Sequence, residues 1–112
     1  MHEMALAESV IRVVDQTARK HAALVRTVWL EIGRLSHVEP EALRFAFDVV
    51  KRDGPARDAR LEIVATDGAA WCMKCSELVT LARLGDACPR CGSYQLQVTA
   101  GDEMRVKEIE IA

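Results

Sequence analysis

Four cysteines in two close pairs have the clearest chemical potential in this 112-residue chain. Each pair has the spacing Cys-x-x-Cys, and the members are Cys72, Cys75, Cys88 and Cys91. Two turns of this type present four thiolates to one tetrahedral metal ion. Zinc suits such a site because it has no geometric preference from d-electrons and binds thiolate strongly. The spacing therefore predicts one structural zinc ion.

Two other uses of paired cysteines fit the sequence less well. A redox pair of the thioredoxin type would stand at a strand-to-helix junction, and neither pair has that setting. A catalytic zinc site keeps an open position and usually has a histidine or carboxylate ligand, whereas four cysteines complete the coordination. The surrounding segment also contains few large apolar residues. A structural zinc, which contributes ~10–16 kcal/mol in small peptides, would supply the missing stability.

A second candidate metal site is the start of the chain, Met1-His2-Glu3. The α-amine of Met1, the deprotonated amide of His2 and its imidazole Nδ1 form a chelate of three nitrogens. Such a set fits the planar coordination that Ni²⁺ or Cu²⁺ prefers and Zn²⁺ does not. The carboxylate or amide of Glu3 offers a further donor. A frayed terminus without a role is the alternative, and the chemistry alone leaves both open.

Five segments of regular structure are predicted around these residues. A helix is expected from Met4 to about Lys20, where apolar residues recur with helical period, and a second from Pro40, which suits a first turn, to the breaker Asp53-Gly54-Pro55. Alternation of apolar and polar residues predicts strands over Leu24–Ile32, Arg60–Ala65 and Met104–Ile111.

These segments predict an α+β fold with an insertion. A three-stranded sheet with two helices on one face would form from residues 1–67 and 101–112, because a 12-residue tail does not fold alone. Residues 68–100 would form an inserted, zinc-ribbon-like domain that contains all four cysteines.

Composition narrows the classes of partner and compartment. The net charge is −2 and the pI about 5.9, which argues against a nucleic-acid partner. The N-terminus lacks the basic residues of a signal peptide, and no apolar run reaches the length of a membrane span. We therefore expect a cytoplasmic protein with no membrane partner. In the cytoplasm, which is reducing, paired cysteines favour metal binding over disulfides.

Over its whole length the chain resembles the HypA family of hydrogenase-maturation nickel metallochaperones. The resemblance rests on the Met-His-Glu start, both cysteine pairs and four further stretches. These are Glu31-Ile32-Gly33 with Leu35-Ser36, Pro40-Glu41-Ala42-Leu43, Phe45-Ala46-Phe47 and Gly101-Asp102-Glu103-Met104-Arg105-Val106. Some members carry a histidine beside each cysteine pair, whereas this chain has Ser76 and Gly92 there.

The resemblance implies two metals with different roles. Nickel would be the transferred cargo, bound at the terminus through His2 with Glu3 and backbone nitrogens nearby, and zinc would be structural. It implies delivery of Ni²⁺ to the large subunit of [NiFe]-hydrogenase together with the GTPase HypB, with urease as a further possible recipient. The activity would be metal transfer and not enzyme catalysis.

Three other classes of function fit the sequence less well. A zinc-ribbon module that binds another protein would have no nickel role. A zinc-dependent nucleic-acid binder is disfavoured by the acidic balance. An enzyme is the weakest option, because the spacing suggests no nucleophile–base pair and no open metal site.

Overall fold

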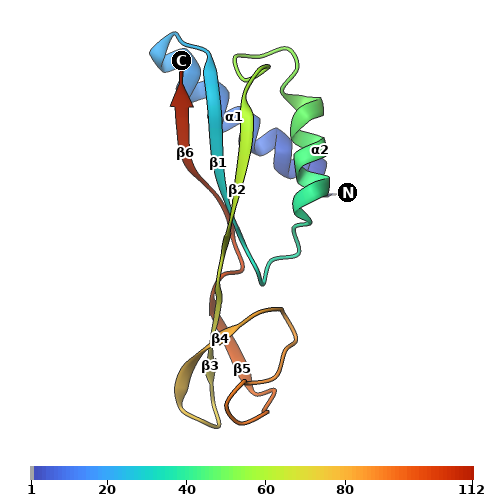
Figure 1. Cartoon of the computed structure of the whole chain (residues 1–112), viewed down its shortest axis with the longest axis vertical. Helices are drawn as coiled ribbons and strands as arrows, with labels where there is room; N and C mark the ends of the chain where they lie inside the picture. Colours follow the sequence, from blue (N-terminus) through green and yellow to red (C-terminus); the bar gives the residue numbers. More distant parts are fainter. Residues whose placement is uncertain (1) are drawn as a thin grey trace. The chain divides into compact units, whose positions relative to one another are not determined.

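The computed structural model describes residues 2–112 (Figure 1). The elements follow the order α1 (His2–His21), β1 (Val25–Gly33), α2 (Pro40–Val50), β2 (Arg60–Thr66), β3 (Gly68–Cys72), β4 (Glu77–Leu81), β5 (Leu96–Ala100) and β6 (Met104–Ile111). The strands form two three-stranded sheets, with the orders β2-β1-β6 and β4-β3-β5. The predicted α+β class is confirmed, with its two helices, its three-stranded sheet and its zinc-ribbon-like insertion. The insertion contains a second sheet, whose strands β3, β4 and β5 were not predicted.

Helix α1 begins at His2, two residues before the predicted start at Met4. The apolar period on which the prediction depended starts later than the helix, whereas Glu3 in the first turn favours the positive end of the helix dipole. One face of α1 is buried and consists of Ala7, Val10, Val14 and Ala18. This spacing of three and four residues gives one continuous apolar stripe.

Helix α2 has a well-defined start. The side chain of Glu39 accepts hydrogen bonds from the backbone N–H groups of Glu41 and Ala42, at 3.3 and 3.1 Å. Pro40 follows as the first helical residue and donates no hydrogen there. The buried face of α2 consists of Leu43, Ala46 and Phe47. The first turn is therefore capped by a carboxylate, which satisfies two N–H groups that lack partners inside the helix.

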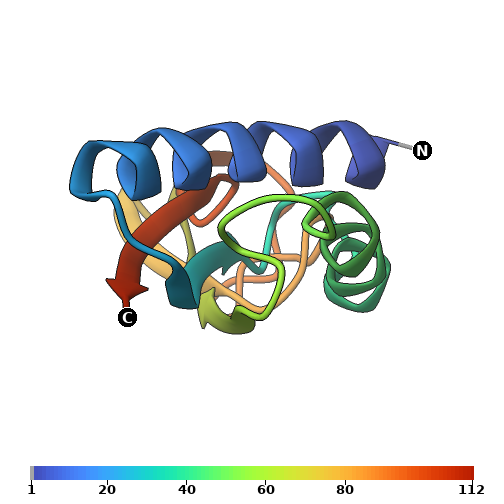
Figure 2. The ribbon, with the colours of Figure 1, turned by 90° about the horizontal axis from the view of Figure 1, so that it is seen from above.

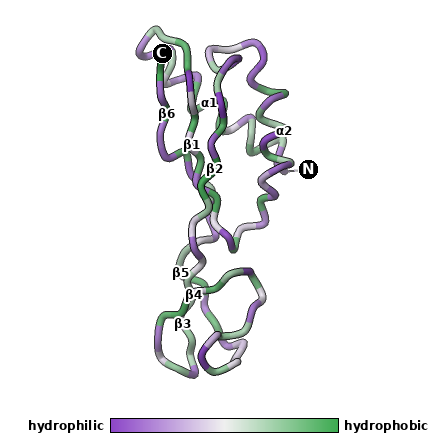
Figure 3. Tube along the Cα trace, in the orientation of Figure 1, coloured by the Kyte–Doolittle hydropathy of each residue, from purple (hydrophilic) through white to green (hydrophobic). Residues whose placement is uncertain are grey.

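Strand β1 is the central strand of the first sheet. Val28, Leu30 and Ile32 alternate along it and are buried, and Figure 3 shows hydrophobic and more polar segments following one another along the first sheet. Both helices lie on the same side of this sheet (Figure 2), so the main core forms between α1, α2 and β1. Near the chain end, Thr27 Oγ1 donates to Glu110 Oε1 at 2.7 Å.

The second sheet is antiparallel throughout. Trp71 on β3 is opposite Leu78 on β4 and Gln97 on β5, and a register shift lies between Ala69 and Ala70. Its core includes Leu35, which follows β1 in the chain, and consists of Leu35, Ala70, Cys72, Val79, Leu81 and Cys88. Two of the cysteines are therefore core residues of this small sheet.

The chain divides into two compact units. One contains the chain up to Leu30 with Val38–Ile63 and Val106–Ala112, and the other contains Glu31–His37 and Val64–Arg105. Three of the four unit boundaries fall within β1, β2 and β6, and the fourth lies between β1 and α2. The narrower assignment of residues 68–100 as the zinc domain stays a prediction.

Neither helix over residues 2–112 is both long enough and apolar enough to cross a membrane.

Candidate metal centre

The four cysteine sulfurs converge on one point. All four Sγ atoms lie within 4.8 Å of one another. The Cys72 and Cys91 sulfurs are 3.7 Å apart, and those of Cys75 and Cys88 are 3.9 Å apart. All four residues are free thiols. Each of these two contacts joins one cysteine of the first pair to one of the second, as expected when both pairs face a shared ion.

Two turns of matching geometry present the sulfurs. In the first pair, the N–H of Ser76 donates to the Cys72 carbonyl at 2.8 Å; in the second, that of Gly92 donates to the Cys88 carbonyl at 2.9 Å. Both donors have a positive φ, 55° at Ser76 and 77° at Gly92. The left-handed conformation favours glycine at such a site.

Burial differs within the cluster. Cys72 and Cys88 are buried, Cys75 is half-buried and Cys91 is exposed. Cys72 ends β3, where it is in register with Glu77 of β4 and Leu96 of β5. The site is therefore anchored in the sheet on one side and reaches solvent on the other.

The surroundings shift the pKa values of Cys75 and Cys88 in opposite directions. Hydrogen bonding to the Cys91 thiol, with partial burial, raises the pKa of Cys75 to about 12. Burial also raises the pKa of Cys88, but the backbone N–H groups of Cys91 and Arg90 outweigh it and bring the pKa down to about 7. Four adjacent thiolates repel one another, so full ionisation needs a cation between them.

The geometry fits a tetrahedral thiolate site. With Zn–S bonds of about 2.3 Å, tetrahedral coordination places the sulfurs about 3.8 Å apart. The distances of 3.7 and 3.9 Å match this spacing, and no two of the four sulfurs are more than 4.8 Å apart. A four-sulfur tetrahedral set is typical of zinc. The cysteines form a metal-binding site, and zinc as its ion stays a prediction.

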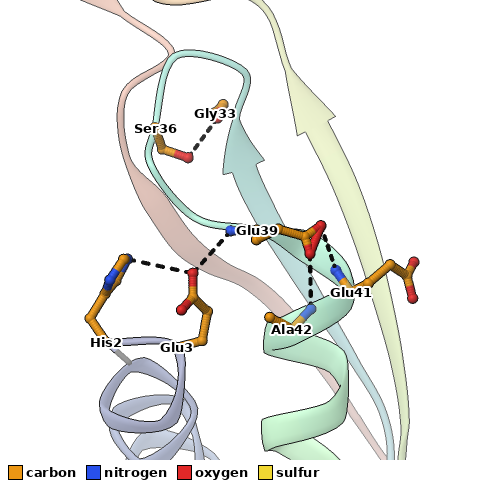
Figure 4. Close-up of polar contacts among 7 residues, drawn as sticks. All are labelled: His2, Glu3, Gly33, Ser36, Glu39, Glu41 and Ala42. Atoms are coloured by element: carbon orange, nitrogen blue, oxygen red, sulfur yellow. Dashed lines mark hydrogen bonds and ion pairs between the residues drawn. The ribbon is translucent and has the colours of Figure 1, made fainter.

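The N-terminal residues lie at the start of α1 (Figure 4). The His2 side chain is 57% exposed and that of Glu3 is 13% exposed. Glu3 Oε2 is 3.6 Å from His2 Nε2 and accepts a hydrogen bond from the backbone N–H of Glu39 at 3.2 Å. Met1 lies outside the described residues. The structure thus brings His2 and Glu3 together, and it adds the start of α2 to their surroundings.

Two residues near these sites had no predicted role there. Leu35 completes the core that includes Cys72 and Cys88. Glu39 directly precedes Pro40 at the start of α2, and its contact with Glu3 spans 36 positions. A Glu-Pro dipeptide does indicate a helix start, but local spacing gives no indication of either long-range contact.

Comparison with known proteins gives the family. Residues 1–111 match the family model described as "Hydrogenase/urease nickel incorporation, metallochaperone, hypA". The chain is 62% identical to the hydrogenase maturation factor HypA of Rhodopseudomonas palustris strain BisB5, with 99% of each chain covered. It is 60% identical to that of Albidiferax ferrireducens strain T118, with the same coverage.

Solved structures agree with the sequence comparison. The solution structure of the Ni metallochaperone HypA from Helicobacter pylori aligns with a TM-score of 0.71 and 28% identity, over 99% of this chain and 97% of that one. A second HypA solution structure aligns with a TM-score of 0.74 and 28% identity, over 100% of this chain and 97% of that one. The chain therefore belongs to the HypA family of nickel metallochaperones for hydrogenase maturation.

Proposed function

We propose that this chain binds Ni(II) at its N-terminus through His2 and delivers it for maturation of [NiFe]-hydrogenase, with one structural zinc held by its four cysteines. The observation that carries the nickel site is the position of His2 as the first residue of α1, with an imidazole that is 57% exposed. Glu3 lies beside it, and Met1 would supply the α-amine.

The start of a helix favours coordination through backbone nitrogen. The first four N–H groups of a helix have no acceptor within the helix. Replacing the amide proton of His2 by a metal ion therefore breaks no helical hydrogen bond. Together with the amine and imidazole Nδ1, this amide gives the three nitrogens of a planar site, and the amide or carboxylate of Glu3 offers a fourth donor.

The exposure of His2 favours transfer of the bound nickel to a partner protein. A partner's ligands reach a metal at the end of an exposed helix and displace its donors one at a time. We propose HypB and the hydrogenase large subunit as these partners, a cytoplasmic setting for the exchange and urease as a possible further recipient. Planar nitrogen coordination disfavours hard cations but not Cu²⁺, which binds more tightly in the Irving–Williams order. Discrimination against copper would then depend on partners or on low copper availability.

Zinc, unlike nickel, would stay bound to this chain. Its four thiolates leave no open position for a nucleophile, so the ion would hold the two cysteine turns together and perform no catalysis. Metal analysis of protein purified in reductant without chelator tests this assignment. One equivalent of zinc per chain is expected, and less than half an equivalent, or iron in its place, would contradict it.

A nickel titration of tag-free protein tests the terminal site. The change His2→Ala should abolish high-affinity Ni²⁺ binding, because it removes the imidazole from the chelate. The change His21→Ala is the matched control, since His21 lies at the other end of α1 with its Nδ1 next to the Thr17 carbonyl. Equal nickel affinity before and after the His2 change would show that the terminal site is wrong.

A further inference from the structure

Glu3 differs from His2 in where its side chain lies. The two residues are adjacent in the first turn of α1, yet the Glu3 side chain is 13% exposed and that of His2 is 57% exposed. A first-turn carboxylate that only offered an oxygen to an incoming ion would gain nothing from leaving solvent. The position of Glu3 therefore requires an explanation from its contacts.

One oxygen of Glu3 makes both contacts. Oε2 accepts a hydrogen bond from the backbone N–H of Glu39 at 3.2 Å and lies 3.6 Å from Nε2 of His2 (Figure 4). Glu39 is the N-cap residue of α2, and its own carboxylate is engaged by Glu41 and Ala42. The hydrogen bond from Glu39 therefore anchors the Glu3 carboxylate to the start of α2.

The contact with Nε2 selects one form of the imidazole. A carboxylate beside Nε2 favours the tautomer that carries its proton on that nitrogen. Nδ1 then has its lone pair free, and Nδ1 is the nitrogen that closes a chelate with the His2 amide. Carboxylates that accept a hydrogen bond from a metal-bound histidine fix its tautomer and ring orientation in this way.

The negative charge of Glu3 also favours nickel binding at this end of α1. A helix N-terminus carries a partial positive charge, which disfavours a divalent cation bound there. A carboxylate in the first turn offsets that charge. This contribution does not require an oxygen–nickel bond, so Glu3 assists nickel binding from the position that it already occupies.

We propose that Glu3 is a positioning residue and not a nickel ligand through its side chain: its carboxylate, anchored by the N–H of Glu39, orients the His2 imidazole for nickel. This inference rests on the proposed terminal nickel site. It leaves any fourth donor from this chain to backbone nitrogen. The proposal also makes the orientation of His2 depend on Glu39, the N-cap residue of α2. Glu39 and α1 belong to the same compact unit.

Three tag-free variants test the proposal: Glu3→Gln, Glu3→Ala and the control Glu8→Gln, which removes one exposed carboxylate from the same helix. In metal-free protein, Glu3→Ala should shift the Glu39 amide resonance and raise its hydrogen-exchange rate. In nickel titrations, both Glu3 variants should weaken binding by 10-fold to 100-fold, the usual effect of losing such a partner. Glu8→Gln should change neither the resonance and exchange rate of the Glu39 amide nor the nickel affinity.

Electronic absorption of the nickel-loaded protein separates positioning from coordination. The nickel d–d bands of Glu3→Gln should match those of the unchanged chain, because the donor set is the same. Shifted bands would show that the carboxylate is a ligand, and unchanged nickel affinity would show that it does not act on the site. Either result overturns the proposal. If His2→Ala also binds nickel normally, the terminal site itself has failed and this inference fails with it.

Discussion

Substitution of Leu35 tests whether packing in the core of the small sheet stabilises the cysteine cluster. It is 2% exposed and packs in the same core as Cys72 and Cys88, although it lies 37 positions before Cys72 in the sequence. Its side-chain carbons lie directly over Gly68, where an added Cβ would overlap them. The change Leu35→Ala should therefore weaken the metal site without touching any ligand.

The expected size of the effect follows from the atoms removed. Leucine to alanine deletes three carbons, and burial of each contributes about 0.8 kcal/mol. A cavity that collapses only partly adds to this loss, which gives roughly 3 kcal/mol, inside the 2–5 kcal/mol range for such changes. Because zinc binding and folding of a small module are one coupled equilibrium, roughly 3 kcal/mol corresponds to an apparent zinc affinity about 100-fold weaker.

Competition with a chromogenic zinc chelator measures this affinity on the full chain. The matched control is Leu84→Ala, since Leu84 belongs to the same cysteine-containing segment but is 49% exposed. The control should change the apparent affinity less than threefold. The reasoning would be refuted if Leu35→Ala also changed it less than threefold, or if both variants weakened it equally.

Two further predictions concern the backbone and pH. Gly101→Ala should destabilise the fold by more than Gly85→Ala: both glycines have positive φ, but a Cβ at Gly101 would overlap the backbone of Asp67 and Gly68, whereas at Gly85 it meets open space among the described residues. Thermal unfolding should show a loss of roughly 1–2 kcal/mol for Gly85 from conformation alone, and more for Gly101. Because hydrogen bonding from the Glu39 amide lowers the Glu3 pKa, the stabilising contribution of that contact is present above the usual value of 4.5 and is lost as pH falls through the lowered value. Glu39 amide exchange, corrected for its intrinsic pH dependence, should lose protection only below pH 4.5; loss above that pH would contradict this.

Periodicity was sufficient for the elements with a strong apolar pattern. Strand β6 has the predicted bounds, and α2 starts at Pro40 as expected. Strand β1 is shifted by one residue at both ends, and β2 ends one residue later than predicted. The start of α1 was placed two residues late, because no apolar residue of the helical face precedes Met4. For a terminal metal site this difference matters, since it places His2 within the first helical turn.

Local sequence patterns did not predict the long-range contacts of Leu35 and Glu39, which support the two candidate sites. The spacing of the cysteines predicted that their sulfurs would meet, because a Cys-x-x-Cys turn is itself a local structure. Leu35 and Glu39 act across 33 or more positions, through packing and one backbone hydrogen bond. Such contacts depend on how the strands pair, which no window of the sequence contains.

If the two candidate sites hold the proposed metals, their locations predict opposite exchange behaviour. Two of the four cysteine sulfurs belong to residues buried in a sheet core, so exposing them means opening that core. The proposed nickel donors belong to the first turn of a helix, where backbone N–H groups have no helical partner and the imidazole is largely exposed. Removing nickel would therefore cost only metal–ligand bonds, which a partner's ligands replace, whereas removing zinc would also cost folding free energy. With the proposed metals bound, one small chain would thus release nickel and retain zinc.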